Sequence, residues 1–271
     1  MLVVLAFVVL FLILWAILIA LEPLIRGSAG RVAHFTAAFR YRDYLPVFVL
    51  LVVGAIVTVF AGDGFIDLAE RVHGKSPALQ KIDARWHDWA VSERTAGATT
   101  FFAAMSVIGG PVVLGLITGL LAAVLAIQRR FRWAAYVAVT VAGGGVVLIE
   151  LKTYFARARP ALAEMLRQAH GYSFPSGHAM GATVALGAYT YLALRVLKTW
   201  RQKAAAIAFA ITFVLAIASS RVYLGVHWLS DIAAGISAGL LWVATTTIGY
   251  ETSRRIRLVR AIRKRRNTPN V

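Results

Sequence analysis

Long apolar segments alternate with short polar ones along the chain. Runs without charged residues, one of them holding two histidines, cover residues 1–21, 44–62, 95–128, 133–149, 168–194, 204–220 and 232–250. Most are long enough for an α-helix to cross a hydrocarbon layer about 30 Å thick, although 133–149 and 204–220 are at the short limit. The pattern therefore predicts an all-α fold, a polytopic transmembrane helical bundle with seven spans.

The composition agrees with a membrane protein. Hydrophobic residues make up 59% of the 271 positions, and the mean hydropathy is +0.72. A soluble core of this size could not bury so much apolar surface. The chain has no cysteine, which excludes a disulfide scaffold, a thiol nucleophile and a thiolate metal site.

The first apolar segment could be a cleaved signal peptide or a retained helix. No Lys or Arg precedes it, and the residues that follow offer no small-residue cleavage pattern. We therefore expect a retained helix. The predicted organisation is an N-terminal transmembrane helix with its cytoplasmic link (1–43), a core domain (44–250) and a basic cytoplasmic tail (251–271).

Basic residues set the predicted orientation. Four arginines follow the first segment, and the positive-inside rule places them in the cytoplasm and the N-terminus outside. Alternating spans then put the basic links 129–132 and 198–203 inside, together with the arginine-rich segment 254–266. The net charge of +17 therefore indicates topology and contact with an anionic leaflet. A nucleic-acid role for the tail is the alternative from charge alone, and we expect no nucleic-acid partner.

Residues 63–94 form a nearly neutral link on the outer side in this topology. Ile82, Trp86 and Trp89 suggest an amphipathic helix that lies at the membrane surface. A gate for substrate is the alternative function of this segment.

Three polar stretches interrupt the apolar pattern, and the topology places all three on the outer face. They are Lys152 with Arg159 and Pro160, Pro175 to His178, and Ser220 and Arg221 with His227 and Asp231. Ionisable groups are costly at membrane depth, so three such span ends on one side favour a functional site over separate interfacial anchors.

The basic residues of these stretches suit a phosphate group. Lys152, Arg159 and Arg221 would surround a tetrahedral anion, because guanidinium forks match phosphate oxygens and an ammonium adds a point charge. Ser176 is an expected helix N-cap, and Gly177 permits close approach to the N–H groups of that helix end. The alternatives are cations that snorkel to headgroups and an ordinary helix start. We predict that these five residues bind phosphate.

Two histidines and an aspartate supply the candidate catalytic groups. His227 and Asp231 are four residues apart, which would place both on one helical face, with the carboxylate orienting the ring and the other ring nitrogen free to attack. His178 is the expected general acid. A structural His–Asp pair and a zinc or iron site are the alternatives, but three nearby cations oppose a divalent metal. We predict no metal and no cofactor.

Other residues close to these motifs are assigned to the membrane interface. They are Glu150, Tyr154, Arg157, Tyr223 and Trp228. Any of them could contact a headgroup or line the lipid entrance, but interfacial anchoring is the more common role, so they stay outside the predicted site.

The three stretches also match a family pattern: Lys-x6-Arg-Pro at 152–160, Pro-Ser-Gly-His at 175–178 and Ser-Arg-x5-His-x3-Asp at 220–231, with all eleven specified positions filled. The chain resembles the type 2 phosphatidic acid phosphatase family, which shares its pocket with vanadium haloperoxidases. The resemblance implies a six-helix core made from the second to the seventh span, to which the first helix is an addition. It also implies metal-free catalysis and inhibition by vanadate or tungstate.

Together these observations predict an integral-membrane lipid phosphatase of the plasma (inner) membrane, with its site on the periplasmic or extracellular face. It would hydrolyse a lipid phosphomonoester or diphosphate through a phosphohistidine. The resemblance implies undecaprenyl diphosphate, phosphatidylglycerophosphate and phosphatidic acid as candidate substrates. A lipid phosphotransferase with the same phosphohistidine is one alternative, and a non-catalytic membrane transporter or scaffold is another.

Overall fold

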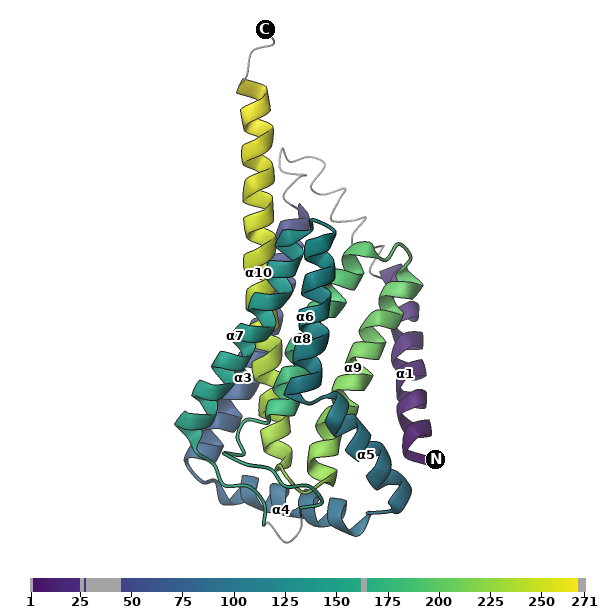
Figure 1. Ribbon diagram of the computed structural model, residues 1–271, viewed down its shortest axis with the longest axis vertical. Coiled ribbons are helices and arrows are strands. Elements are labelled where there is room, and N and C mark those ends of the chain that lie inside the picture. Colours follow the sequence, from purple (N-terminus) through teal and green to yellow (C-terminus); the bar gives the residue numbers. More distant parts are fainter. Residues whose placement is uncertain (1, 25–26, 28–44, 162–164, 268–271) are drawn as a thin grey trace.

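The computed structural model describes residues 2–24, 27, 45–161 and 165–267 (Figure 1). The described part contains helices and no strands, which confirms the predicted fold class. The helices are α1 (Leu2–Ala20), α3 (Leu45–His73), α4 (Pro77–Ser92), α5 (Ala96–Ile108), α6 (Pro111–Ile127), α7 (Phe131–Phe155), α8 (Gly177–Val196), α9 (Trp200–Tyr223) and α10 (Leu229–Asn267).

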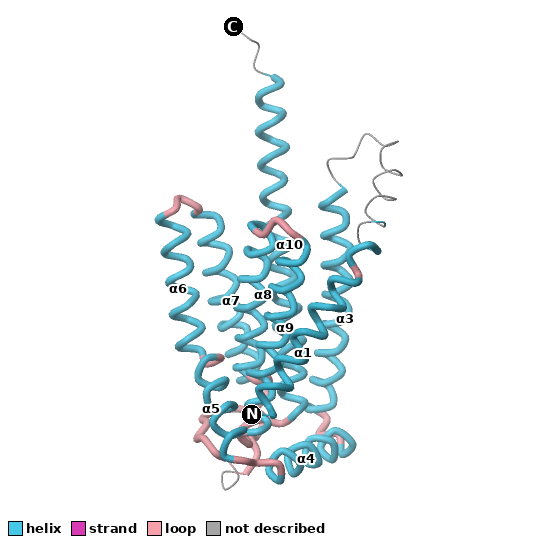
Figure 2. Tube along the Cα trace, turned by 90° about the vertical axis from the view of Figure 1, so that its right-hand side faces the viewer, coloured by secondary structure: helices cyan, strands magenta, loops and turns pink. Residues whose placement is uncertain are grey.

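Most of the helices run along one axis, while α4 lies across one end of the bundle (Figures 1 and 2). At the opposite end α10 continues beyond the other helices. This helix passes through the predicted boundary between residues 250 and 251 without a break. Most of the predicted cytoplasmic link 22–43 lies outside the described residues.

Four described helices are long and apolar enough to cross a membrane: α1, α7, α9 and α10. The bent pair α5–α6 would be a fifth crossing if it forms one span. The prediction of seven spans therefore remains a prediction. The two segments thought to be short belong to longer helices, since α7 has 25 residues and α9 has 24.

The predicted span at 95–128 is not one straight helix, because α5 and α6 meet at a bend of 47°. Pro111 begins α6, where its missing N–H leaves no helical hydrogen bond unmade. At the bend Gly109 packs directly on α9, since a Cβ there would lie 2.2 Å from Cγ2 of Ile217. Only glycine allows this approach.

The predicted span at 168–194 is also too long, because its first nine residues are not helical and α8 begins at Gly177. Gly171 has a φ of +73°, which suits glycine but not a helix interior. The backbone N–H of Ser173 donates to the carbonyl of Arg157 at 2.8 Å. The segment therefore folds onto the chain that follows α7.

The helix α8 forms the core of the bundle, packed against α7, α9 and α10. Two glycines of α10 permit the approach of α8: a Cβ on Gly235 would lie 2.7 Å from the carbonyl oxygen of Ser176, and one on Gly239 would lie 2.7 Å from Cβ of Thr183. Small residues four apart on one helix face commonly allow such close packing in membranes. The contact fixes the start of α8 against the start of α10.

The additional N-terminal helix α1 packs mainly against α9. Two indoles make reciprocal contacts: Trp15 Nε1 donates to the carbonyl of Arg201 at 3.1 Å, and Trp200 Nε1 donates to that of Leu18 at 2.8 Å. These contacts hold one end of α1 against the start of α9.

The surface helix α4 has two different faces. Asp83 and His87 are buried against the bundle, whereas Ile82, Trp86 and Trp89 are exposed. Exposed indoles on a helix across the end of a bundle are typical of a membrane-interface element.

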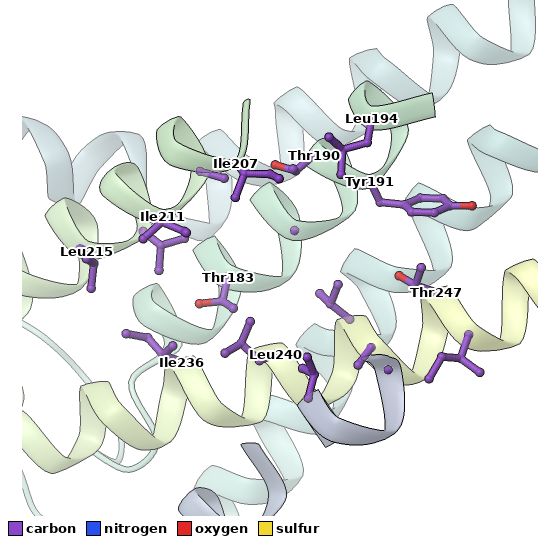
Figure 3. Close-up of a pocket in the computed structure, with 18 residues that line it drawn as sticks. Thr183, Thr190, Tyr191, Leu194, Ile207, Ile211, Leu215, Ile236, Leu240 and Thr247 are labelled. Carbon is purple, nitrogen blue, oxygen red and sulfur yellow. The ribbon is translucent and has the colours of Figure 1, made fainter. Parts of the chain in front are cut away.

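An apolar cavity of about 460 Å³ lies between α3, α8, α9 and α10 (Figure 3). The polar groups in its lining are hydroxyls, such as those of Thr183, Tyr191 and Thr247. None of the predicted site residues lines it.

Candidate active site

A second cavity, of about 330 Å³, brings together six of the eight predicted site residues. They are Lys152, Arg159, Gly177, His178, Arg221 and His227. The C-terminal ends of α7 and α9 and the N-terminal ends of α8 and α10 supply these residues with their adjoining loops, all at the α4 end of the bundle (Figure 1). Stretches far apart in sequence therefore meet at one place.

His227 lies in the loop between α9 and α10 and is 2% exposed. Its Nδ1 is 3.2 Å from Oδ2 of Asp231, and its Nε2 is 3.1 Å from Nη1 of Arg159. We assign the proton to Nδ1, because the carboxylate can only accept. The lone pair on Nε2 then faces the guanidinium of Arg159.

The charge state of His227 follows from its burial. Desolvation lowers the pKa of His227 from 6.5 to about 4, although the hydrogen bond to Asp231 acts in the opposite direction. The imidazole is therefore neutral at pH 7 and retains a lone pair, as a nucleophile requires.

The pairing of His227 with Asp231 does not arise from a shared helical face, as the spacing had suggested. The helix α10 begins at Leu229, so His227 precedes it and Asp231 lies in its first turn. The Asp231 carboxylate turns back and accepts the backbone N–H of Trp228 at 2.9 Å. This helix-capping contact therefore holds the Asp231 carboxylate next to His227.

The Asp231 carboxylate is fully buried and receives further hydrogen bonds. Oδ2 accepts from the hydroxyl of Ser173, and Oδ1 accepts from Nη1 of Arg157 at 2.6 Å. Neither donor was in the predicted site. Arg157 had been assigned to the membrane interface, and that interpretation is wrong because its guanidinium faces two buried carboxylates, those of Asp231 and Asp83.

Backbone carbonyls hold two of the predicted phosphate-binding cations. Arg159 donates to the carbonyls of His170, Gly171 and Tyr172 and to that of Val226. Lys152 Nζ donates to the carbonyl of Tyr172 at 2.5 Å. Burial lowers the pKa of Arg159, but a guanidinium remains charged at neutral pH. These contacts fix the two cations at the cavity.

Ser106 of α5 connects the third cation with the second histidine. Its hydroxyl accepts from Nη1 of Arg221, and its carbonyl is 3.1 Å from Nε2 of His178. Arg221 is 6% exposed, and its Nε is buried without a hydrogen-bond partner in the described residues. Sequence reasoning missed Ser106 because nothing near it resembles a motif.

Ser176 is the N-cap residue of α8, as predicted, but its side chain makes no capping hydrogen bond. Its hydroxyl is buried without a partner in the described residues, and its N–H donates to the carbonyl of Asp231 at 2.9 Å. Gly177 lines the cavity, and a Cβ there would lie 3.1 Å from Cδ2 of Leu148. The turn therefore joins the start of α8 to Asp231.

Within the described residues no three His, Cys, Asp or Glu side chains are arranged to hold a metal ion. The ionisable groups that line the cavity are basic: Lys152, Arg159, Arg221 and three histidines, His170, His178 and His227. This donor set suits an anion.

Comparison with known proteins shows a family likeness. Residues 132–255 match the model of the PAP2 superfamily. This part of the chain is similar to that superfamily. The matched segment runs from α7 to α10, the four helices whose ends and adjoining loops supply the predicted site residues.

Individual proteins show the same likeness. The chain is 37% identical over 93 residues to phosphatidylglycerophosphatase B of Bacillus subtilis (strain 168), a match that covers 34% of this chain and 45% of that protein. A crystal structure of a transmembrane PAP2 type phosphatidylglycerolphosphate phosphatase from Bacillus subtilis superposes with a TM-score of 0.66 at 25% identity, over 72% of this chain and 96% of the other. Aquifex aeolicus LpxE shares the fold at 22% identity, with a TM-score of 0.50, over 61% and 94%.

Two residues outside the matched segment lie in or next to the predicted site. Ser106 of α5 contacts Arg221 and His178, and Asp83 of α4 contacts Arg157 and Ser230, which both bind or adjoin Asp231. Helices that precede the matched segment therefore contribute to the surroundings of the site.

Proposed function

We propose that this protein is a membrane lipid phosphatase that hydrolyses a lipid phosphomonoester or diphosphate through a phosphohistidine. The observation that carries the proposal is the position of His227, whose Nδ1 contacts a buried carboxylate while the ring lines a cavity shared with Lys152, Arg159 and Arg221. The similarity of residues 132–255 to the PAP2 superfamily and the phosphatase names of the relatives support the same class of reaction.

The proposed first step is attack of His227 Nε2 on phosphorus. The three cations neutralise the phosphoryl oxygens and hold the group in line. An N–P bond forms while the bond from phosphorus to the leaving oxygen breaks. Asp231 stabilises the positive charge that develops on the ring through the Nδ1–H hydrogen bond.

The leaving oxygen takes a proton from His178. In the imidazolium form of His178, the carbonyl of Ser106 holds the proton on Nε2, so the proton on Nδ1 is the one to transfer. In the second step water attacks phosphorus, the N–P bond breaks and His178 accepts the proton of the water. Free phosphate is the product.

The lipid class follows from the surroundings of the site. The cavity is at the end of a transmembrane bundle, beside a helix that exposes Trp86 and Trp89. A lipid phosphate would keep its chains in the bilayer and place its headgroup there. Phosphatidylglycerophosphate is the first substrate to test, because two relatives carry that activity in their names. Undecaprenyl diphosphate and phosphatidic acid are the next.

Orientation supports a site on the outer face. The cavity is at the end of the bundle opposite the arginine-rich extension of α10, and basic segments favour the cytoplasm. The chain has no cysteine, so Ala161→Cys would carry a single thiol in an exposed loop near the site. We expect an impermeant thiol reagent to label it from outside intact cells. Labelling only after the membrane is opened would place the site in the cytoplasm.

The decisive experiment measures phosphate release by the purified protein from these three lipids. His227→Ala should abolish release, whereas His73→Ala, an exposed histidine at the end of α3, should retain it. An active His227→Ala protein would refute the nucleophile. Transfer to an acceptor lipid without free phosphate would indicate a phosphotransferase, and no turnover of any kind would favour a non-catalytic role. Activity should also survive EDTA, and loss reversed by zinc would revive a metal site.

A further inference from the structure

A network of buried polar groups connects the surface helix α4 to Asp231. Asp83 of α4 is 2% exposed. Its Oδ1 accepts the N–H of Ser230 at 2.9 Å, and its Oδ2 accepts the Ser230 hydroxyl at 2.6 Å and Nη2 of Arg157 at 2.7 Å. Asp83 therefore contacts the residue before Asp231 and the arginine that binds Asp231.

Arg157 bridges the two carboxylates. Its Nη1 donates to Oδ1 of Asp231 at 2.6 Å and to the Ser230 hydroxyl at 2.7 Å. The guanidinium carbon also lies 5.8 Å from the centroid of the Trp228 ring. A planar guanidinium with two forked ends fits this bridging position, whereas a lysine could not span it.

We propose that Arg157 and Asp83 are positioning residues of the phosphatase site, which hold the Asp231 carboxylate in the orientation that His227 requires. This inference rests on the proposed function. It assigns a catalytic task to α4, a helix that lies outside the family match and carries none of the motif residues.

The division of hydrogen bonds at Asp231 supports this role. Oδ2 faces His227, Ser173 and the N–H of Trp228, whereas Oδ1 is held by Arg157. Without Arg157 the carboxylate would lose the contact that fixes its rotation, and a buried charge would remain uncompensated. Loss of a residue that orients a catalytic group commonly costs about 10- to 100-fold in activity.

The charges also predict opposite effects for the two residues. The charged and titratable groups around His227 are Asp231 of α10, Arg159 of the loop after α7, Arg221 of α9, His178 of α8, Lys152 of α7 and His170 of the loop before α8. Removal of the Arg157 cation leaves two uncompensated carboxylates, which favours the imidazolium and raises the pKa of His227. Neutralising Asp83 leaves the Arg157 cation less compensated and lowers that pKa.

The experiment compares Arg157→Met, Arg157→Lys and Asp83→Asn with wild type over a range of pH. The exposed pair of Arg71 and Asp67, which are 2.8 Å apart on α3, gives the matched controls Arg71→Met and Asp67→Asn. We expect Arg157→Met to lower kcat about 10- to 100-fold with little change in KM. It should also move the acidic limb of the pH profile of kcat/KM to higher pH. Arg157→Lys should return the acidic limb toward its wild-type pH, and Asp83→Asn should move it to lower pH. The controls should change neither kcat nor the pH of this limb.

Titration of His227, followed by NMR of the protein labelled with 15N-histidine, reports the same shifts without turnover. The inference is overturned if folded Arg157→Met retains the wild-type kcat and limb. It is also overturned if Arg157→Met and Asp83→Asn lower activity while the His227 titration stays in place, since that pattern means a purely structural role. A wild-type protein that releases no phosphate refutes the proposed function instead, and opposite NMR shifts in that protein would still support the positioning network.

Discussion

The contact between Gly235 and the start of α8 can be tested by adding a single carbon atom. In Gly235→Ala the new Cβ would lie 2.7 Å from the carbonyl oxygen of Ser176, 3.1 Å from Cβ of Ala179 and 3.2 Å from the backbone N of Met180. Two of these three atoms belong to the backbone, so no change of rotamer can relieve the clash. The helices α8 and α10 must move apart.

The size of the effect combines two terms. Overpacking of a tight contact costs about 1–3 kcal/mol, and alanine in place of a mid-helix glycine returns about 0.5–1 kcal/mol. The net loss is therefore up to about 2.5 kcal/mol, which lowers Tm by up to about 10 °C at 2–4 °C per kcal/mol. Activity should fall further, about tenfold or more, because displacement of the Ser176 turn also moves Gly177 and His178 relative to His227.

Thermal unfolding in detergent at one fixed scan rate, together with phosphate release, measures both effects. The matched control is Gly249→Ala in the same helix, where a Cβ meets nothing within 4 Å. We expect that control to be as stable as wild type or up to about 1 kcal/mol more stable, with unchanged activity. If Gly235→Ala and Gly249→Ala behave alike, the close approach of α8 and α10 does not hold the site together.

Three further predictions concern the site itself. Because burial lowers the pKa of His227 to about 4, the acidic limb of the pH profile of kcat/KM, where the ring loses its lone pair, should lie near that value; an acidic limb at pH 6.5 or above would contradict the burial argument. Asp231→Asn should lower kcat by about 10²- to 10⁴-fold, since the amide can donate to Nδ1 and favour the tautomer with Nε2 protonated; a wild-type rate would remove the orienting role. Vanadate should inhibit competitively, and Arg221→Lys should weaken that inhibition by more than it raises KM; equal changes would mean no preference for the transition-state geometry.

The gathering of the motif residues could be predicted from sequence because it depends on topology. Spans that alternate in direction bring the end of one helix and the start of the next to the same side, and the basic links fix which ends these are. The amphipathic character of α4 was also legible, since Ile82, Trp86 and Trp89 mark its exposed face.

The supporting residues could not be predicted, because their roles depend on contacts between distant positions. Arg157 meets Asp83 across 74 positions, and Arg221 meets Ser106 across 115. An arginine near a span end more often snorkels to the interface, so the local pattern favoured the wrong role for Arg157. The role of Arg157 depends on the buried carboxylate of Asp83 in α4, which only the fold brings close to the guanidinium.

The two misplaced boundaries have a related cause. Hydropathy reports whether a segment is apolar, but not whether its backbone groups bond within a helix. The break at Gly109 and Gly110 serves packing against α9, and residues 170–173 direct their carbonyls to Arg159 and Lys152. Irregular backbone at membrane depth occurs where other protein groups form hydrogen bonds with its N–H and carbonyl groups. Here the basic side chains of the site donate to its carbonyls.

The contacts of Arg159 connect anion binding with activation of the nucleophile. Four of its five N–H groups donate to backbone carbonyls, which fix the guanidinium in place, and the fifth is directed at Nε2 of His227. A phosphate oxygen that accepts this fifth N–H must lie beside Nε2, and by accepting it the oxygen releases the lone pair that attacks. In the proposed mechanism the group that binds the anion would therefore mask the nucleophile until an anion is bound, and lysine, with a single ammonium, could not keep the four anchoring contacts while performing this exchange.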